Sequence, residues 1–136
     1  GVDLRNKHTY LASYLLQEKA KGSSSEWWPY ICTLPPRYDS MPIFFDEPTL
    51  SWLTGPEFSS DSSSGSFTLA KIADRIDSLK REYDNIRRAI PEFSQFSLED
   101  FIWARMVVIT RTYGLDIDGS KTDGLIPFAD MLNHRR

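Results

Sequence analysis

The chain has 136 residues, a length typical of one domain, and its 40% hydrophobic and 13% aromatic content suffices for a buried core. A net charge of −3, spread along the sequence, argues against non-specific binding to nucleic acid, which requires a basic surface. The single cysteine, Cys32, excludes an internal disulfide and, without neighbouring ligands, a zinc site. No apolar run is long enough for a membrane helix, and no signal peptide is visible. We therefore expect an intracellular protein of the cytoplasm or nucleus, with an organelle left open.

The first predicted helix runs from about Lys7 to Lys21. Leu11, Tyr14 and Leu15 lie on one stripe of this helix, and Gly22 follows its lysine-rich last turn as a stop signal. This pattern predicts an amphipathic helix that packs on a core.

An aromatic and proline-rich segment follows, from Trp27 to Pro36. Its prolines predict one short helical turn around Trp28 to Ile31 and then extended chain. We interpret the tryptophans as packing anchors. The alternative is that Trp27 or Trp28 lines a ligand groove, as in proline-peptide binders.

A short helix is predicted to start at Asp46-Glu47-Pro48, because an acidic residue followed by proline in the first turn favours helix initiation. Leu50 and Leu53 are expected to face the core, and Gly55-Pro56 to end the helix. The serine-rich tract 59–66 is typical of a flexible, solvated loop, which could also be phosphorylated.

The longest predicted helix runs from about Thr68 to Ile90, and Pro91 ends it. Apolar residues at alternating spacings of three and four form one narrow seam: Leu69, Ile72, Ile76, Leu79, Tyr83, Ile86 and Ile90. Acid–base pairs with the favoured spacing lie on the opposite face: Asp77 with Arg81, and Asp84 with Arg88. The seam could form a coiled coil, but we favour packing within the domain.

A further helix is predicted to begin at Ser97, whose hydroxyl can accept a hydrogen bond from the backbone N–H near Asp100. Up to Ile109 this helix has almost no polar face, so we expect it to be the central one. Arg105 and Arg111 are exceptions, and a buried guanidinium must be paired. Arg111 could also simply complement the dipole at the end of the helix.

From Gly114 to Gly124 we expect a polar loop. Its aspartates resemble the start of a calcium loop, but Gly119 comes too early and no glutamate closes the pattern. The segment Leu125–Phe128 is predicted to form a short buried strand, with Pro127 limiting its hydrogen bonds.

Two segments together carry a resemblance to a known family. Thr110-Arg111-Thr112-Tyr113 ends the apolar helix, and Leu125-Ile126-Pro127-Phe128-Ala129-Asp130-Met131-Leu132-Asn133-His134 follows the polar loop. This arrangement resembles the SET-domain protein methyltransferases, in the branch of the Rubisco large-subunit lysine and actin-histidine methyltransferases. Upstream segments add to the likeness: Pro29-Tyr30-Ile31, Leu34-Pro35, Pro42-Ile43-Phe44-Phe45 and Leu53-x-Gly55.

The resemblance implies a mainly α chain. Residues 1–113 would form the helical insert of a SET domain, with about four helices and the flexible loop 59–66. Residues 114–136 would form a loop and the start of the SET core that follows the insert.

The resemblance also implies S-adenosylmethionine as cofactor. The residues expected at the cofactor are Arg111, Asp130, Met131, Leu132, Asn133 and His134. Tyr113 and Ala129 correspond to positions near the acceptor pocket. An aromatic ring with a small residue resembles the lysine-methylating members, whereas the histidine-methylating member has an amide and a tryptophan there. We therefore expect a protein substrate, histone or non-histone, that is methylated on lysine, and no nucleic-acid or membrane partner.

Three parts of the family pattern are absent from these 136 residues: the glycine-rich cofactor segment, the segment with the catalytic tyrosine, and the C-terminal substrate-binding domain. The resemblance therefore assigns no catalytic residue here and predicts an internal fragment that is inactive alone and could form a homodimer. Two alternatives stay open: a non-catalytic helical interaction module that uses the seam of residues 68–90, and a degenerate SET protein that only binds partners.

Overall fold

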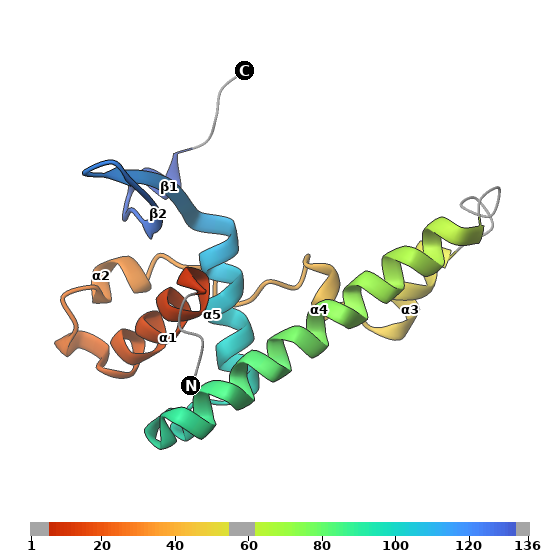
Figure 1. Cartoon of the computed structure of the whole chain (residues 1–136), viewed down its shortest axis with the longest axis horizontal. Coiled ribbons are helices and arrows are strands. Elements are labelled where there is room, and N and C mark those ends of the chain that lie inside the picture. Colours follow the sequence, from red (N-terminus) through yellow and green to blue (C-terminus); the bar gives the residue numbers. More distant parts are fainter. Residues whose placement is uncertain (1–5, 55–61, 133–136) are drawn as a thin grey trace. The chain divides into compact units, whose positions relative to one another are not determined.

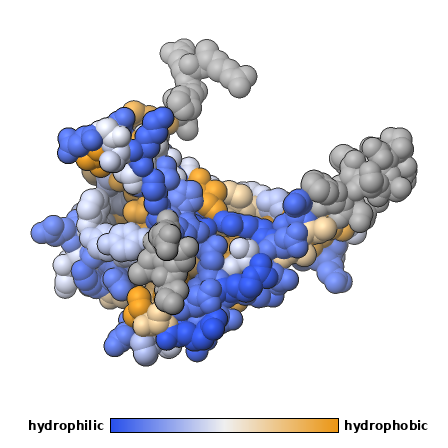
Figure 2. Space-filling model, in the orientation of Figure 1, coloured by the Kyte–Doolittle hydropathy of each residue, from blue (hydrophilic) through white to orange (hydrophobic). Residues whose placement is uncertain are grey.

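The structure is a computed structural model that describes residues 6–54 and 62–132 (Figure 1). These residues are mainly α-helical and include one two-stranded sheet, which confirms the predicted fold class. The chain divides into two compact units, one made of residues 1–36 and 86–136 and the other of residues 37–85. Within the described ranges, no helix combines the length and the apolar character that crossing a membrane requires. On the face shown in Figure 2, hydrophilic residues predominate and hydrophobic residues form small areas.

The core of the first unit lies between helices α1 (Lys7–Ala20) and α5 (Leu98–Arg111), which pack against each other (Figure 1). Asn6 caps α1 by accepting a hydrogen bond from the His8 N–H at 3.2 Å. Gly22, with a φ of +57°, lets the chain turn away after the helix. The buried apolar residues of the two helices include Ala12, Leu15, Leu16, Phe101, Ala104, Met106, Val107 and Val108.

The start of α5 confirms the predicted cap. Ser97 and Asp100 form a capping box in which the Ser97 hydroxyl accepts from the Asp100 N–H at 3.0 Å, and the Asp100 carboxylate accepts from the Ser97 N–H at 3.0 Å. The hydrogen bond from the Ser97 side chain lowers the pKa of the Asp100 carboxyl. As predicted, α5 is surrounded on most sides, and even Arg105 is only 2% exposed.

The short helix α2 (Trp28–Ile31) matches the predicted turn between the prolines. The extended chain after it is tied to α5 by the Trp103 indole N–H, which donates to the Pro35 carbonyl at 2.9 Å. The Lys19 ammonium of α1 lies 3.8 Å from the centre of the Trp103 ring, in cation–π geometry. Trp103 thus links α1, α5 and the chain after α2.

The segment predicted as a polar loop is a β-hairpin, so that prediction was wrong. Strand β1 (Thr112–Ile117) pairs antiparallel with β2 (Ser120–Leu125), with Thr112 opposite Leu125 and Ile117 opposite Ser120. Asp118 and Gly119 form the two-residue turn with φ angles of +51° and +78°. Positive φ at both positions suits the right-handed twist of a hairpin, and Asp-Gly is a favoured pair there.

The strand predicted over Leu125–Phe128 was also wrong, because β2 ends at Leu125. Phe128 has a φ of +70° and is 67% exposed, so it is neither extended nor buried. A single 3₁₀ turn, η6 (Ala129–Met131), follows it. Pro127 lacks an N–H for a ladder, which is consistent with the chain leaving the sheet here.

The second unit begins with the 3₁₀ turn η2 (Pro42–Phe44) and helix α3 (Glu47–Ser51), continued by η3 (Trp52–Thr54). Asp46 caps α3 as predicted, by accepting from the Thr49 N–H at 2.9 Å, and hydrogen bonding to Thr49 lowers the pKa of the Asp46 carboxyl. Leu50 and Leu53, which we expected in the core, are only half-buried.

Helix α4 (Ser62–Ala89) starts six residues before the predicted Thr68. Residues 62–66 of the serine-rich tract are therefore helical rather than loop, whereas residues 59–61 lie outside the described residues. The last turn of α4, from Ile86, belongs to the first unit. Along the predicted seam, Leu79, Tyr83 and Ile86 are buried, and the residues toward the start of the helix are half-exposed.

Candidate functional site

The candidate site is built on the η6 turn (Ala129–Met131), which follows the hairpin. The Asp130 N–H donates to the Ile126 carbonyl at 3.3 Å, and the Met131 N–H donates to the Phe128 carbonyl at 3.2 Å. These bonds reverse the chain directly after Phe128, whose positive φ begins the turn. The turn therefore presents Ala129, Asp130 and Met131 in consecutive positions of one short loop.

Asp130 ties this turn to two helices of the first unit. Its Oδ2 atom accepts a hydrogen bond from Arg111 Nη1 at 2.8 Å and another from the Tyr30 hydroxyl at 2.8 Å. The Asp130 side chain is 1% exposed and that of Arg111 is 20% exposed, so the ion pair is largely shielded from water. A shielded carboxylate needs such partners, because burying an unpaired charge is costly. Arg111 therefore has a specific partner beyond the helix dipole considered from sequence.

The other carboxylate oxygen of Asp130 differs from the first. Oδ1 is buried and accepts no hydrogen bond from any residue that the structure describes. A buried acceptor of this kind favours a donor close by, whether from a ligand or from another part of the protein. The Asp130 carboxylate thus combines one fully used oxygen with one that can receive a donor.

The structure brings Tyr113 and Ala129, the two residues expected near the acceptor, into direct contact. The Tyr113 hydroxyl donates to the Ala129 carbonyl at 2.9 Å. Tyr113 lies on β1 opposite Gly124 and is 38% exposed, so the ring is accessible while its hydroxyl is held. A third segment, the hairpin, is in this way attached to the η6 turn.

Of the four other residues expected at the cofactor, the structure describes two. Met131 and Leu132 are 51% and 76% exposed, so their side chains are accessible for contact with another molecule. Asn133 and His134 lie outside the described residues. Arg111 and Asp130 are therefore in contact, and the side chains of Met131 and Leu132, which follow Asp130, are exposed.

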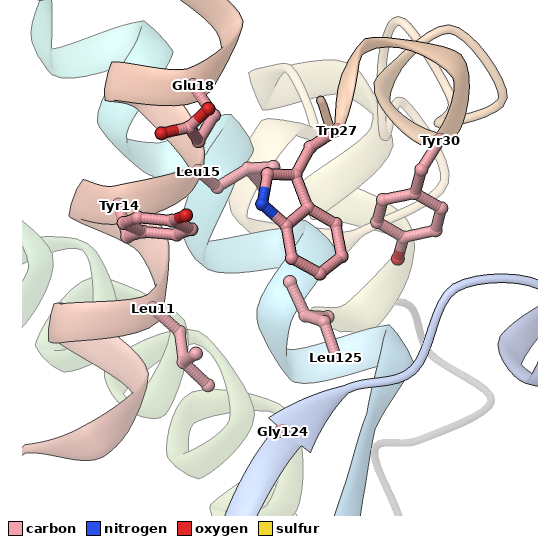
Figure 3. Close-up of a pocket in the computed structure, with 8 residues that line it drawn as sticks. All are labelled: Leu11, Tyr14, Leu15, Glu18, Trp27, Tyr30, Gly124 and Leu125. Atoms are coloured by element: carbon pink, nitrogen blue, oxygen red, sulfur yellow. The ribbon is translucent and has the colours of Figure 1, made fainter. Parts of the chain in front are cut away.

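A half-open pocket lies beside this turn, between α1, the chain around α2 and the end of β2. Its volume is about 200 Å³. It is lined by Leu11, Tyr14, Leu15, Glu18, Trp27, Tyr30, Gly124 and Leu125 (Figure 3). Trp27 is 40% exposed and lines this pocket, and its indole lies between Tyr14 of α1 and Tyr30 in Figure 3. Both interpretations of Trp27, as a packing anchor and as part of a ligand groove, stay predictions.

Polar contacts of Glu18, one of the lining residues, hold the backbone at Trp27 in place. The Ser25 hydroxyl donates to Glu18 Oε2 at 2.6 Å, and the Trp27 N–H donates to the Ser25 hydroxyl at 3.1 Å. Lys21 forms an ion pair with the same carboxylate. Hydrogen bonds from Lys21 and then Ser25 lower the pKa of Glu18, and the bond to Glu18 raises the pKa of Lys21. Glu18 is therefore ionised and neutralised within the protein at neutral pH.

The sequence did not single out Tyr30, Glu18 or Tyr14 as site residues. Tyr30 lies 100 residues from Asp130, so no local spacing could reveal their contact. The available signal was the Pro29-Tyr30-Ile31 segment, which locates the residue in a short turn without indicating its partner. Among the described residues, no group of three or more histidine, cysteine, aspartate or glutamate side chains could hold a metal ion.

Comparison with known proteins gives similarity over nearly the whole chain. The chain is 34% identical over 126 residues to the actin-histidine N-methyltransferase of Gallus gallus, covering 91% of this chain and 21% of that protein. It is 35% identical over 126 residues to the actin-histidine N-methyltransferase of Danio rerio, with the same coverage. It is 28% identical over 134 residues to the ribosomal lysine N-methyltransferase set10 of Schizosaccharomyces pombe, covering 96% of this chain and 22% of that protein.

The chain therefore spans about a fifth of the length of these relatives. All three are protein N-methyltransferases by name, two of them for histidine and one for lysine. No protein-family model matches the chain.

Proposed function

We propose that this chain is part of an S-adenosylmethionine-dependent, SET-domain protein methyltransferase that acts on lysine. The observation that carries the proposal is the similarity to protein methyltransferases along 91% or more of the chain. Within that similarity, the η6 turn is held by contacts from α2, α5 and β1, all of which the first unit contains. A turn anchored on three sides is suited to present its polar and exposed groups to a ligand.

The described residues suit one wall of a cofactor site. Asp130 Oδ1 offers a buried acceptor, and the exposed side chains of Met131 and Leu132 offer apolar contact for a flat ring. Asn133 and His134 are proposed to add hydrogen bonds to the same wall. When bound there, S-adenosylmethionine would supply an electrophilic methyl group on sulfur. Arg111 would act indirectly, by holding the Asp130 carboxylate in place.

The lysine assignment rests on Tyr113 and Ala129. The Tyr113 hydroxyl is fixed on the backbone carbonyl of Ala129, so an aromatic residue lies next to a residue with a methyl-sized side chain. A small side chain leaves room for a long alkylamine, whose neutral nitrogen must approach the methyl group in line. Similarity to both histidine and lysine methyltransferases makes the acceptor the feature most in need of a test.

The test is methyl transfer by the full-length protein to two peptides that differ only in having lysine or histidine at the acceptor position. We expect methylation of the lysine peptide alone, detected by mass spectrometry. Ala129→Trp should lower that activity at least about tenfold, because the indole fills the space for the alkylamine. Ala89→Trp, at an exposed position at the end of α4, is the matched control and should leave activity unchanged. Methylation of the histidine peptide alone would refute the lysine assignment.

A second function, a non-catalytic helical interaction module, is favoured by one observation. Leu69, Ile72 and Ile76 on the seam of α4 are half-exposed, which is suited to contact with a partner helix or a second copy of the chain. This alternative predicts self-association that depends on concentration and that Ile72→Asp weakens, measured by sedimentation. It also predicts that the full-length protein does not bind S-adenosylmethionine, which separates it from the enzyme.

A further inference from the structure

We propose that Tyr30 is a positioning residue of the candidate methyl-transfer site, acting through Asp130. Its hydroxyl lies 2.8 Å from Asp130 Oδ2 and so holds the side chain at the centre of the η6 turn. The inference rests on the proposed function, since it concerns the same site. It adds a residue from α2, about a hundred positions earlier in the chain, to the parts that shape this site.

Tyr30 is held in place by burial and by hydrogen bonds on either side of α2. The residue is 4% exposed, and α2 is preceded by the Ser25–Trp27 contacts and followed by the Pro35–Trp103 hydrogen bond. Figure 3 shows the Tyr30 ring lining the pocket beside Trp27, with its hydroxyl directed away from the α2 backbone. A phenol ring has few rotatable bonds, so a buried ring fixes the position of its hydroxyl within a narrow range.

Tyr30 and Arg111 bind the same oxygen of Asp130, and this determines how the carboxylate is oriented. Two donors from different helices converge on Oδ2, so rotation of the carboxylate would break both bonds. Oδ1 is thereby kept in its buried position, where it has no hydrogen-bond partner among the described residues. Without the Tyr30 hydroxyl, Arg111 alone could follow the carboxylate as it rotates, and Oδ1 would lose its defined direction.

Two tyrosine hydroxyls hold neighbouring residues of this turn. Tyr30 binds the side chain of Asp130, and Tyr113 binds the backbone carbonyl of Ala129. Tyr113 is 38% exposed at the expected acceptor position, whereas Tyr30 is buried behind the turn. The two tyrosines thus have different tasks, one facing the acceptor and the other setting the orientation of Asp130.

The opposing interpretation is that Tyr30 is only a core residue whose ring fills space beside Trp27. That interpretation predicts that losing the hydroxyl changes global stability slightly and affects no single part of the protein. Tyr30→Phe separates the two, because it retains the ring and removes only the hydroxyl. Tyr10→Phe is the matched control, since Tyr10 lies on α1 and is 57% exposed.

The first measurement uses the full-length protein. We expect Tyr30→Phe to raise the Kd for S-adenosylmethionine about fivefold, as loss of one ordinary hydrogen bond would. With cofactor in excess, kcat should stay within about twofold, because Tyr30 does not touch the reacting atoms. Tyr10→Phe should leave both quantities unchanged. An unchanged Kd in Tyr30→Phe would overturn the proposal.

The second measurement does not depend on activity. It is amide hydrogen exchange of this chain at Asp130, Met131 and Leu132, whose N–H groups bond to carbonyls within the turn. Tyr30→Phe should accelerate exchange there several-fold and leave the β1–β2 amides unchanged. An equal change at both places would mean a general loss of stability and would also overturn the proposal.

A double substitution tests whether Tyr30 and Asp130 act on the turn through the same contact. Asp130→Asn should by itself accelerate exchange in the turn, and Tyr30→Phe should then add little, because both act through one contact. Additive effects would contradict the proposed coupling. If exchange responds as expected but the wild-type protein binds no S-adenosylmethionine, the proposed function fails, and what stands is only that the Tyr30 hydroxyl orders the η6 turn through Asp130.

Discussion

At the scale of single residues, Asp130 shows how burial changes the meaning of a motif. From the sequence, Asp130 was expected to lie at the cofactor and to shape its turn. Its side chain is 1% exposed, and one oxygen is already bound by Arg111 and Tyr30. These two hydrogen bonds pair the shielded carboxylate and hold the turn, and Oδ1 is left for another donor.

Arg111, the cationic partner of Asp130, also has a contact that its position in the sequence does not reveal. The sequence placed it in the last turn of a helix, where a cation is favourable for any function. Its bond of 2.8 Å to Asp130, nineteen residues later, shows that it also connects α5 to the η6 turn. The sequence could predict that a guanidinium here needs a partner, but not which of several acids would provide one.

Asp100 provides a test of residue-level electrostatics. The hydrogen bond from the Ser97 side chain lowers the pKa of Asp100 in the folded protein. Its stabilising contribution is therefore fully present above the ordinary aspartate pKa of about 3.9, and it is lost as the pH falls through the lower folded-state value. We expect Asp100→Asn to lower the free energy of unfolding by up to about 1 kcal/mol at neutral pH.

The measurement is urea unfolding of wild type and Asp100→Asn at several pH values, and the difference should vanish in acid. Glu99→Gln, one residue earlier in the same helical turn, is the control. Glu99 is exposed, so its loss should change the free energy of unfolding by less than about 0.5 kcal/mol. A difference for Asp100→Asn that is constant down to strongly acidic pH would contradict the assignment.

At the scale of elements, the helices were predicted well because their signals are local. The Ser97 cap, the Asp46 cap and the short turn at Trp28–Ile31 each depend on residues within one or two turns. The start of α4 was misplaced, because serine and glycine favour loops on average although a helix continues through them here. Propensity is a weak signal, and helices commonly extend past their strongest residues.

The hairpin was missed although its signal was present. Asp118-Gly119 is a strong sign of a two-residue hairpin turn, but the flanking residues are polar and do not alternate clearly. The spacing of the aspartates instead resembles the start of a calcium-binding loop. The Asp116 carboxylate in fact accepts from the Gly119 N–H at 2.9 Å, so it stabilises the turn.

Substitution of glycines in the hairpin tests this turn. Gly119 has a φ of +78° and open space around the position of a Cβ atom, so Gly119→Ala isolates the backbone strain. We expect it to lower hairpin stability by about 1 kcal/mol. Gly114→Ala, in β1 with equally open space, has no such strain and is the control; it should leave hairpin stability unchanged or raise it slightly, because alanine has less backbone freedom than glycine in the unfolded chain.

The readout is urea unfolding followed through NMR signals of β1 and β2. Because Tyr113 on β1 holds the Ala129 carbonyl, Gly119→Ala should also increase motion in the η6 turn. Equal effects of the two substitutions would argue against a strained turn at Asp118-Gly119.

At the scale of the whole molecule, the chain is similar to about a fifth of each methyltransferase relative and folds into two compact units. The first unit holds all the described candidate site residues, from Tyr30 to Leu132. The side chains of Phe128, Met131 and Leu132 are exposed within the described part of the chain, which agrees with the proposal that these residues form one wall of a cofactor site. A complete cofactor site is proposed to require more of the protein.

Calorimetry tests this view of the whole protein. We expect the full-length protein to bind S-adenosylmethionine and the 136-residue chain to bind it at least about a hundredfold more weakly, because the proposal assigns to this chain one wall of the site. S-adenosylhomocysteine serves as a second ligand that shares the adenine and amino-acid groups. Equal affinity of the chain and the full-length protein would show that the residues of this chain suffice for the site.

The sequence by itself determined the mainly helical class, the capped helix starts and the resemblance of Arg111 to His134 to a methyltransferase site. These features depend on local patterns and on short motifs, which can be read without knowing the fold. Only the tertiary structure decided that Arg111 and Tyr30 share one oxygen of Asp130, that Tyr113 holds Ala129, and that residues 112–125 form a hairpin. The contacts to Asp130 and Ala129 join segments between 16 and 100 residues apart, and such pairings arise from packing, which no local pattern encodes.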